Sequence, residues 1–415
     1  MLINFIYQLK HKIHKISFYL TSSILTLCLF SSSIYAYEPQ SVNAKFNAAG
    51  ISINQLQVKA GSWIIYDAVS GQIIDGDKIH ERIPIADFTR LMLIYMLFNH
   101  IHASKLKLTD KINIPKDLQR QIEKHVNNKH ILNLKKELLV KDVVLSSLIN
   151  NSKDASLVLN YLLSQDGNVI HGMNQEAKRL GLSNTHFDNI LGSESPYHYT
   201  TAYDLVRLIQ ILINTHKNSR DLFTQKQFVY NTITYTNTNN ILLIDKMIDI
   251  SLNSNFKGKP SFIVSKERVE DNITQQKRRI ISVIIDSHDM DEETQESLRM
   301  LNYGFSDFDT VKIYDENTRI GQYKLWMGKQ DTINLGVKET VYLTLPKAAV
   351  STRLSTVIDK PKYIYAPIQE GNELGSIKWI HQDKEIYKIP VIALETVHEA
   401  NFISRWIDRI RMFFY

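Results

Sequence analysis

One apolar stretch, residues 88–98, constrains the fold of this chain more than any other feature. It contains neither Gly nor Pro and hardly any polar side chain, which predicts a helix buried on most of its sides. Just before it, residues 62–67 and 72–74 are strand formers that flank Ala68-Val69-Ser70-Gly71, a pattern that predicts a β-hairpin. Asp87 stands where the helix is expected to take its N-cap. A hairpin that leads into a buried helix is therefore the expected centre of the fold.

Later segments predict further helices and then strands. Residues 140–149 have helical spacing of apolar side chains, and Asp154 is expected to cap a helix over residues 155–163. Thr200 or Thr201 is expected to cap another helix. The sequence then becomes rich in strand formers, with strands expected at residues 241–249, 262–264 and 280–286.

Four segments are expected along the chain. Residues 1–36 read as a secretory signal peptide, because a basic region precedes a short apolar run and a small-residue cleavage site. Residues 37–308 form the main α/β domain. Residues 309–395 contain short strands bounded by turns, which predicts a small antiparallel β-sandwich. Residues 396–415 predict an amphipathic helix.

Composition excludes several classes of function. The formal net charge of +6 is too small and too evenly interspersed with acids to indicate a nucleic-acid partner. The single cysteine, Cys28, lies in the predicted leader, so the mature chain has no thiol chemistry and no disulfide. The 14 histidines show no metal-ligand spacing, and no metal or other cofactor is expected.

The six residues Ile85-Ala86-Asp87-Phe88-Thr89-Arg90 carry a resemblance to a known family. They resemble the P-A-S-x-T-K motif of penicillin-binding proteins, and most closely that of the low-molecular-mass D-alanyl-D-alanine carboxypeptidases, which are serine peptidases of the S11 type. In that motif Ser is the nucleophile and Lys is the proton acceptor. This chain keeps Ala86 and Thr89 but has Asp87 at the Ser position and Arg90 at the Lys position.

Two further motifs of the family are also altered. The S-G-N triplet corresponds to Asn151-Ser152-Lys153, and the Asp-Ala pair that follows it is retained. The K-T-G triplet corresponds without gaps to Leu252-Asn253-Ser254. A five-residue slip would instead place it at Lys257-Gly258-Lys259. The ungapped register is preferred, because it also aligns the next strand.

The resemblance implies a penicillin-binding-protein domain of the β-lactamase/transpeptidase type with a helical subdomain, followed by the β-sandwich and the terminal helix. The altered motifs imply a loss of acyl-enzyme chemistry. A carboxylate has no hydroxyl proton to give up, and a guanidinium is protonated at any relevant pH and cannot act as a base. His186 and His198 are expected near the edge of the cleft. The alternative is an active serine carboxypeptidase that trims the terminal D-Ala of pentapeptides with a displaced nucleophile.

The expected ligand is a peptidoglycan stem peptide or muropeptide, or another cell-wall enzyme such as an active carboxypeptidase. We hypothesise that Arg90, Ser152 and Lys153 bind the ligand, with the cations paired to its carboxylate. The resemblance also implies a periplasmic protein attached to the outer face of the inner membrane by the terminal helix. The residues expected to contact the membrane are Phe402, Ile403, Trp406, Ile407, Ile410, Phe413 and Phe414.

Overall fold

The computed structural model describes residues 40–412, apart from residues 54, 127–130, 135, 238–240, 272–275, 288–289 and 350–353. The expected signal peptide, and Phe413 and Phe414 of the expected membrane contact, lie outside the described residues. Described residues from Ser41 onward form one compact unit.

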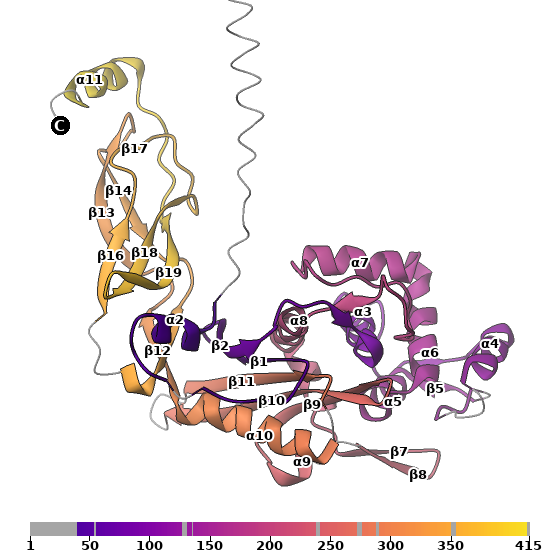
Figure 1. Cartoon of the computed structure of the whole chain (residues 1–415). Helices are drawn as coiled ribbons and strands as arrows, with labels where there is room; N and C mark the ends of the chain where they lie inside the picture. Colours follow the sequence, from indigo (N-terminus) through magenta and orange to yellow (C-terminus); the bar gives the residue numbers. More distant parts are fainter. Residues whose placement is uncertain are drawn as a thin grey trace, which may run out of the picture. The chain divides into compact units, whose positions relative to one another are not determined.

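A five-stranded sheet lies at the centre of the main domain, with the strand order β2-β1-β11-β10-β9. All of its neighbouring strands pair antiparallel. Side chains of β1 alternate between two cores, with Ile64 on one face of the sheet and Ile65 on the other. The hairpin prediction is confirmed by β1 and β2, which pair antiparallel at one edge of the sheet (Figure 1). The strands are β1 (Ser62–Asp67), β2 (Gln72–Asp77), β9 (Ile248–Phe256), β10 (Lys259–Asp271) and β11 (Gln276–Ile285).

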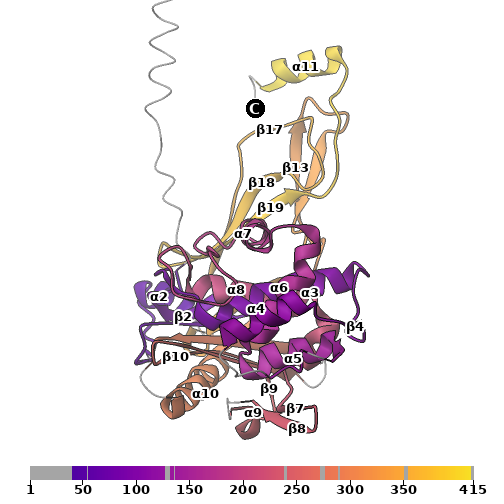
Figure 2. The ribbon, with the colours of Figure 1, turned by 90° about the vertical axis from the view of Figure 1, so that its right-hand side faces the viewer.

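Helices cover one face of this sheet, with α3 (Thr89–His102) at their centre. Leu91, Leu93 and Leu97 of α3 are fully buried, which confirms the helix predicted from the apolar stretch. Thr201 caps α8 with its hydroxyl, as expected. Figure 2 shows these helices gathered above the sheet. The others are α4 (Lys116–Val126), α5 (Val140–Asn150), α6 (Lys153–Leu163), α7 (Val169–Arg179) and α8 (Ala202–Thr215).

The opposite face packs against α2 (Val42–Ala48) and α10 (Met290–Ser306) through a second core. The strand predicted over residues 241–249 is wrong in its first half. Ile241–Ile244 form the short helix α9, and β9 begins only at Ile248. Four apolar residues in a row do not by themselves distinguish a buried helical turn from a strand.

The C-terminal part is a β domain with its own core. Its six-stranded sheet has the order β16-β18-β19-β14-β13-β17, and β12 pairs with β15. The expectation that all these strands pair antiparallel is wrong for β13 and β17, which pair parallel. The strands are β12 (Phe308–Tyr314), β13 (Arg319–Trp326), β14 (Thr332–Gly336), β15 (Val341–Pro346), β16 (Ser355–Asp359), β17 (Ile364–Tyr365), β18 (Glu373–His381) and β19 (Lys384–Ala393).

The terminal helix α11 (Phe402–Met412) follows the β domain. Of the helices in the described ranges, none is both long and apolar enough to cross a membrane. Other short elements include β3 (Ile83–Pro84), the 3-10 helix η1 (Ala86–Phe88), β4 (Lys111–Ile112), β5 (Leu138–Leu139), β6 (Tyr199–Thr200), β7 (Gln227–Tyr230) and β8 (Ile233–Thr236).

Candidate active site

The motif positions meet where η1 leads into α3, beside the edge strand β9. Ala86 has a φ of 45°, in the left-handed region that L-residues rarely adopt. A loop packs directly onto it, because a Cβ added at Gly192 would lie 2.2 Å from the Ala86 carbonyl oxygen. The turn before Asp87 is therefore held tightly, and only glycine fits at position 192.

Asp87 is not the N-cap of the helix, contrary to the prediction, and no side chain caps η1 or α3. Its backbone N–H donates to Ser254 Oγ at 3.1 Å. Its carboxylate Oδ2 accepts the backbone N–H of Asn255 at 3.3 Å. Paired backbone N–H groups beside a nucleophile are what an oxyanion hole requires. Here side chains of the protein itself occupy both.

Arg90 is only 2% exposed and does not bond to the Asp87 carboxylate. One terminal nitrogen donates to the Asp87 carbonyl at 2.5 Å, and the other donates to the Asn253 carbonyl at 2.8 Å. Burial lowers the pKa of Arg90 to about 10, with the charge of Asp87 partly opposing the shift. The guanidinium thus stays protonated at neutral pH and cannot serve as a base.

The second motif approaches the same strand. Asn151 ends α5 in the left-handed conformation, and its Nδ2 donates to the Asn253 carbonyl at 3.2 Å. Ser152 is the buried N-cap of α6, where its Oγ accepts the Ala155 N–H. The expected capping role of Asp154 is therefore wrong. Lys153 is exposed to solvent.

Asp154 instead binds a distant segment of the chain. Its carboxylate oxygen Oδ2 accepts the N–H groups of Ile131 and Leu132, both at 2.9 Å. Its other oxygen, Oδ1, accepts the Ala155 N–H at 2.8 Å, so the carboxylate serves a tertiary contact and a local one.

The third motif position lies on β9 as the ungapped register has it. Leu252 is 1% exposed and belongs to the apolar core, whereas Asn253 and Ser254 bond to Arg90 and Asp87 respectively. The alternative triplet 257–259 lies in the tight turn between β9 and β10, where Lys257 forms an ion pair of 2.6 Å with Glu194. An aliphatic side chain thus stands where the family pattern has lysine.

A chain of buried hydrogen bonds connects His198 to the start of α3. The Asp188 N–H donates to His198 Nδ1 at 3.0 Å, so the ring proton lies on Nε2, which donates to Thr89 Oγ1 at 2.7 Å. The Thr89 hydroxyl donates in turn to the Ala86 carbonyl. Burial lowers the pKa of His198 to about 4. His198 is therefore a buried positioning residue. His186 lies nearer the surface and is half-exposed.

Sequence reasoning missed two participants, Asn255 and the bonding role of His198. Asn255 follows Ser254 directly in the ungapped register, so its backbone position was predictable, but its bond to Asp87 was not. His198 lies more than 100 residues from its partner Thr89, and no local pattern marks it.

The motif positions of this centre do not pair a hydroxyl with a lysine amine. Of the hydroxyls bonded at this centre, neither Ser152 nor Ser254 bonds to the amine of a described lysine. Among the residues that the structure describes, no three His, Cys, Asp or Glu side chains are grouped to hold a metal ion. Position 87 has a carboxylate, position 90 a fixed cation, and both backbone donors are taken.

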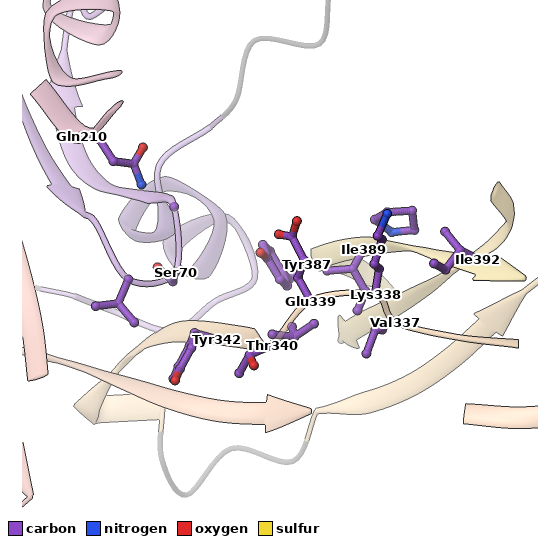
Figure 3. Close-up of a pocket in the computed structure, with 14 residues that line it drawn as sticks. Ser70, Gln210, Val337, Lys338, Glu339, Thr340, Tyr342, Tyr387, Ile389 and Ile392 are labelled. Atoms are coloured by element: carbon purple, nitrogen blue, oxygen red, sulfur yellow. The ribbon is translucent and has the colours of Figure 1, made fainter. Parts of the chain in front are cut away.

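A cavity of about 440 Å³ lies elsewhere, between the β1–β2 turn and the C-terminal β domain (Figure 3). Ser70 and Gln210 line it on one side, and Thr340, Tyr342 and Tyr387 line it on the other. Burial raises the pKa of Tyr387. None of the motif positions lines this cavity, so it is separate from the candidate active site.

A helix start with nucleophile and base positions, packed against the edge of an antiparallel sheet, defines a penicillin-binding-protein fold of the carboxypeptidase class. The sequence model of the D-alanyl-D-alanine carboxypeptidases (peptidase S11) matches residues 49–288, and that of the C-terminal domain of penicillin-binding protein 5 matches residues 308–399. The chain therefore belongs to the D-alanyl-D-alanine carboxypeptidase family and is a homologue from the peptidoglycan machinery.

Curated relatives and solved structures agree with this assignment. The D-alanyl-D-alanine carboxypeptidase DacC of Escherichia coli is 27% identical over 373 residues, which cover 89% of this chain and 92% of the relative. DacD of the same organism is 26% identical over 85% of this chain and 90% of its own length. Penicillin-binding protein 5 from Haemophilus influenzae has the same fold, with a TM-score of 0.74 at 21% identity, covering 84% of this chain and all of that one.

Proposed function

We propose that this protein is a catalytically inactive carboxypeptidase homologue that acts by binding, at the periplasmic face of the inner membrane. The proposal rests on the candidate active site, whose backbone groups are already hydrogen-bonded to the protein's own side chains. We call this arrangement the closed centre. Asp87 replaces the nucleophile, and buried Arg90 bonds to the carbonyls of Asp87 and Asn253. Loss of the nucleophile or the base of a serine hydrolase costs on the order of 10⁶-fold in turnover. Both are absent here.

The closed centre also limits how a ligand binds. A peptide that added to β9 as a further strand would need the Asn253 carbonyl and the Asn255 N–H, and the protein itself already occupies both. Arg90, at 2% exposure, does not offer its charge to a ligand in this arrangement, and Ser152 is committed to capping α6. Exposed Lys153 is the member of the hypothesised set that supports binding of a stem-peptide carboxylate.

Attachment to the membrane is the second part of the proposal. The described residues of α11 that were expected to contact the bilayer are all exposed, and a terminal helix with a cationic polar face suits the membrane interface. Their exposed fractions are 73% for Phe402, 69% for Ile403, 57% for Trp406, 41% for Ile407 and 43% for Ile410.

A labelled penicillin tests the inactivity. The chain without residues 1–36 is incubated with excess reagent and its intact mass is measured. We expect no covalent adduct, because no activated hydroxyl lies at the centre. An adduct would contradict the proposed inactivity and support the alternative, an active carboxypeptidase with a displaced nucleophile. The variants Ser152→Ala and Ser254→Ala would then identify which hydroxyl had reacted.

Calorimetric titration with a muropentapeptide tests the binding. We expect Lys153→Ala to weaken binding about tenfold, the value of one charge-assisted hydrogen bond. Lys116→Ala, at an exposed lysine of α4, is the matched control and should bind as the parent does. If the parent does not bind, the stem peptide is excluded as ligand and a cell-wall protein is left as the partner.

A further inference from the structure

The helix α11 is docked by one side only. Asp408 is 7% exposed, and its Oδ2 accepts the backbone N–H of Met327 at 2.8 Å. Successive residues of a helix are rotated by about 100°. On that spacing the exposed side chains of Phe402, Ile403, Trp406 and Ile410 lie on the far side of α11 from Asp408, and Ile407 lies at the flank. The apolar face therefore points away from the β domain that holds the helix.

A groove beside this helix extends the apolar surface onto the β domain. Met327, Tyr363 and Tyr365 line a cavity of about 540 Å³ together with Arg409 and Met412 of α11. Among the described residues, none that lines this cavity is acidic. Figures 1 and 2 both show β17, which contains Tyr365, at the end of the β domain next to α11. Tyr365 itself is 44% exposed.

Lysines lie over the aromatic rings of this end of the domain. Lys362 Nζ lies 4.9 Å from the centre of the Tyr363 ring, and Lys360 Nζ lies 4.9 Å from that of Tyr323. Aromatic rings with a polar end and lysines with long apolar stems are the side chains that suit the boundary between lipid headgroups and hydrocarbon. Their combination is unusual for a surface that meets only water.

The cations around the groove are not neutralised by the protein. Lys360, Lys362 and Arg409 form no ion pair with any described residue, whereas nearby Lys324 lies 3.5 Å from Asp331. Each basic side chain close to an anionic membrane contributes about 1 kcal/mol to attraction. An uncompensated positive charge beside exposed apolar groups is complementary to anionic phospholipid.

We infer that this end of the β domain, composed of Lys360, Lys362, Tyr363 and Tyr365, is a second membrane-contact surface that binds anionic phospholipid headgroups beside α11. The inference rests on the proposed membrane attachment and deepens it. Two adjoining contacts fix the angle at which the β domain meets the bilayer. A single helix on a flexible link would leave that angle free.

Co-sedimentation with vesicles tests the inference. The chain without residues 1–36 is mixed with vesicles of phosphatidylcholine alone, or of phosphatidylcholine with phosphatidylglycerol. We expect Lys360→Glu/Lys362→Glu to reduce partitioning onto the anionic vesicles about tenfold or more, because two attractive charges become repulsive. The control is Lys116→Glu/Lys124→Glu, the same charge change on exposed lysines of α4, which should leave partitioning within about twofold.

The outcomes separate the two proposals. Binding of the parent with no change in Lys360→Glu/Lys362→Glu overturns the second contact surface and leaves the attachment by α11 standing. No binding of the parent to either kind of vesicle contradicts membrane attachment itself.

A label gives a readout that does not depend on affinity. The only cysteine of the chain is Cys28, so Tyr365→Cys in the chain without residues 1–36 is a single labelling site. An environment-sensitive fluorophore there should shift to the blue and brighten when anionic vesicles are added. The same label at Lys116→Cys should not respond. An unshifted spectrum at position 365 in vesicle-bound protein also overturns the inference.

Discussion

Arg278 and Arg90 are both buried close to an aspartate, and they are held in different ways. Arg278 is 1% exposed, and its Nε donates to the Asp67 carboxylate at 2.8 Å. Arg90 is 2% exposed, but its two hydrogen bonds go to backbone carbonyls, and the Asp87 carboxylate bonds elsewhere. The first is an ion pair, whereas the second is a cation held by peptide dipoles.

Asp67 and Arg278 lie at the junction between the main domain and the C-terminal β domain, and further hydrogen bonds surround the pair. Asp67 Oδ1 accepts the N–H groups of Val69 and Ser70, and Oδ2 also accepts the Thr310 hydroxyl at 2.5 Å. The Ser70 hydroxyl continues the network to Thr344 at 2.7 Å. The β1–β2 turn is thereby joined to β12 and β15 of the C-terminal domain. Buried charges are stabilising only when they are paired and hydrogen-bonded in this manner.

The difference shows what each aspartate–arginine pair does. At the junction the carboxylate neutralises the arginine, so the pair holds two domains together. At the candidate active site the charge of Asp87 favours the charged form of Arg90, but the carboxylate forms no hydrogen bond with the guanidinium. The Asp87 carboxylate accepts the Asn255 N–H and Arg90 donates to the Asn253 carbonyl, so together they occupy the edge of β9. We call Asp87 and Arg90 the plug, because they occupy these two backbone groups. Their contribution to the free energy of unfolding should be small.

The largest expected effect is at the junction. Asp67→Ala removes the partner of buried Arg278 and should lower the free energy of unfolding by about 3–5 kcal/mol. Urea unfolding of the chain without residues 1–36 at pH 7 measures this. Asp315→Ala, which breaks the exposed ion pair with Lys312, is the control and should change stability by less than about 1 kcal/mol. Equal losses in both variants would show that the junction network is not special.

An intermediate effect is expected behind the candidate active site, and it depends on pH. Burial holds the pKa of His198 at about 4, against an ordinary value of 6.5, so between these values the unfolded chain binds a proton that the folded chain does not. Its contribution is complete above pH 6.5 and is lost as the pH falls toward 4. The loss should reach about 3 kcal/mol.

His198→Gln removes this titration, so its stability should change less between pH 7 and pH 4 than that of the parent. His186→Gln, at the neighbouring half-exposed ring, is the control and should keep the parent's pH dependence. Parallel pH profiles for the parent and His198→Gln would contradict the assignment of a neutral, buried ring.

Local sequence patterns predicted the elements that local chemistry determines. The hairpin of β1 and β2 and the helix α3 follow from strand formers around a tight turn and from an apolar stretch without Gly or Pro. Thr201 caps α8 because its hydroxyl needs only the N–H of Asp204, three residues on. Motif spacing likewise identified Asp87, Arg90 and the β9 triplet, since a register requires only residue order.

The errors arose where partners come from far along the chain. Asp87 and Asp154 are well suited to N-caps, but their Oδ2 atoms accept tertiary N–H groups, from Asn255 for Asp87 and from Ile131 and Leu132 for Asp154. The N-cap of α6 is Ser152, two residues earlier than predicted. The bonding of Arg90 to the Asn253 carbonyl joins residues 163 positions apart. A local sequence pattern does not predict which distant groups the end of a long side chain will contact.

The smallest expected effect is at the plug. Arg90→Met keeps the length of the side chain, removes a buried cation with no carboxylate partner, and gives up two hydrogen bonds to carbonyls. These changes oppose each other, so the free energy of unfolding should change by no more than about 1 kcal/mol. The matched variant Arg278→Met leaves Asp67 buried without its cation and should cost about 3–5 kcal/mol. Urea unfolding of both variants at pH 7 measures the contrast. If Arg90→Met costs as much as Arg278→Met, Arg90 is a structural ion of the same kind, and the distinction between plug and junction fails.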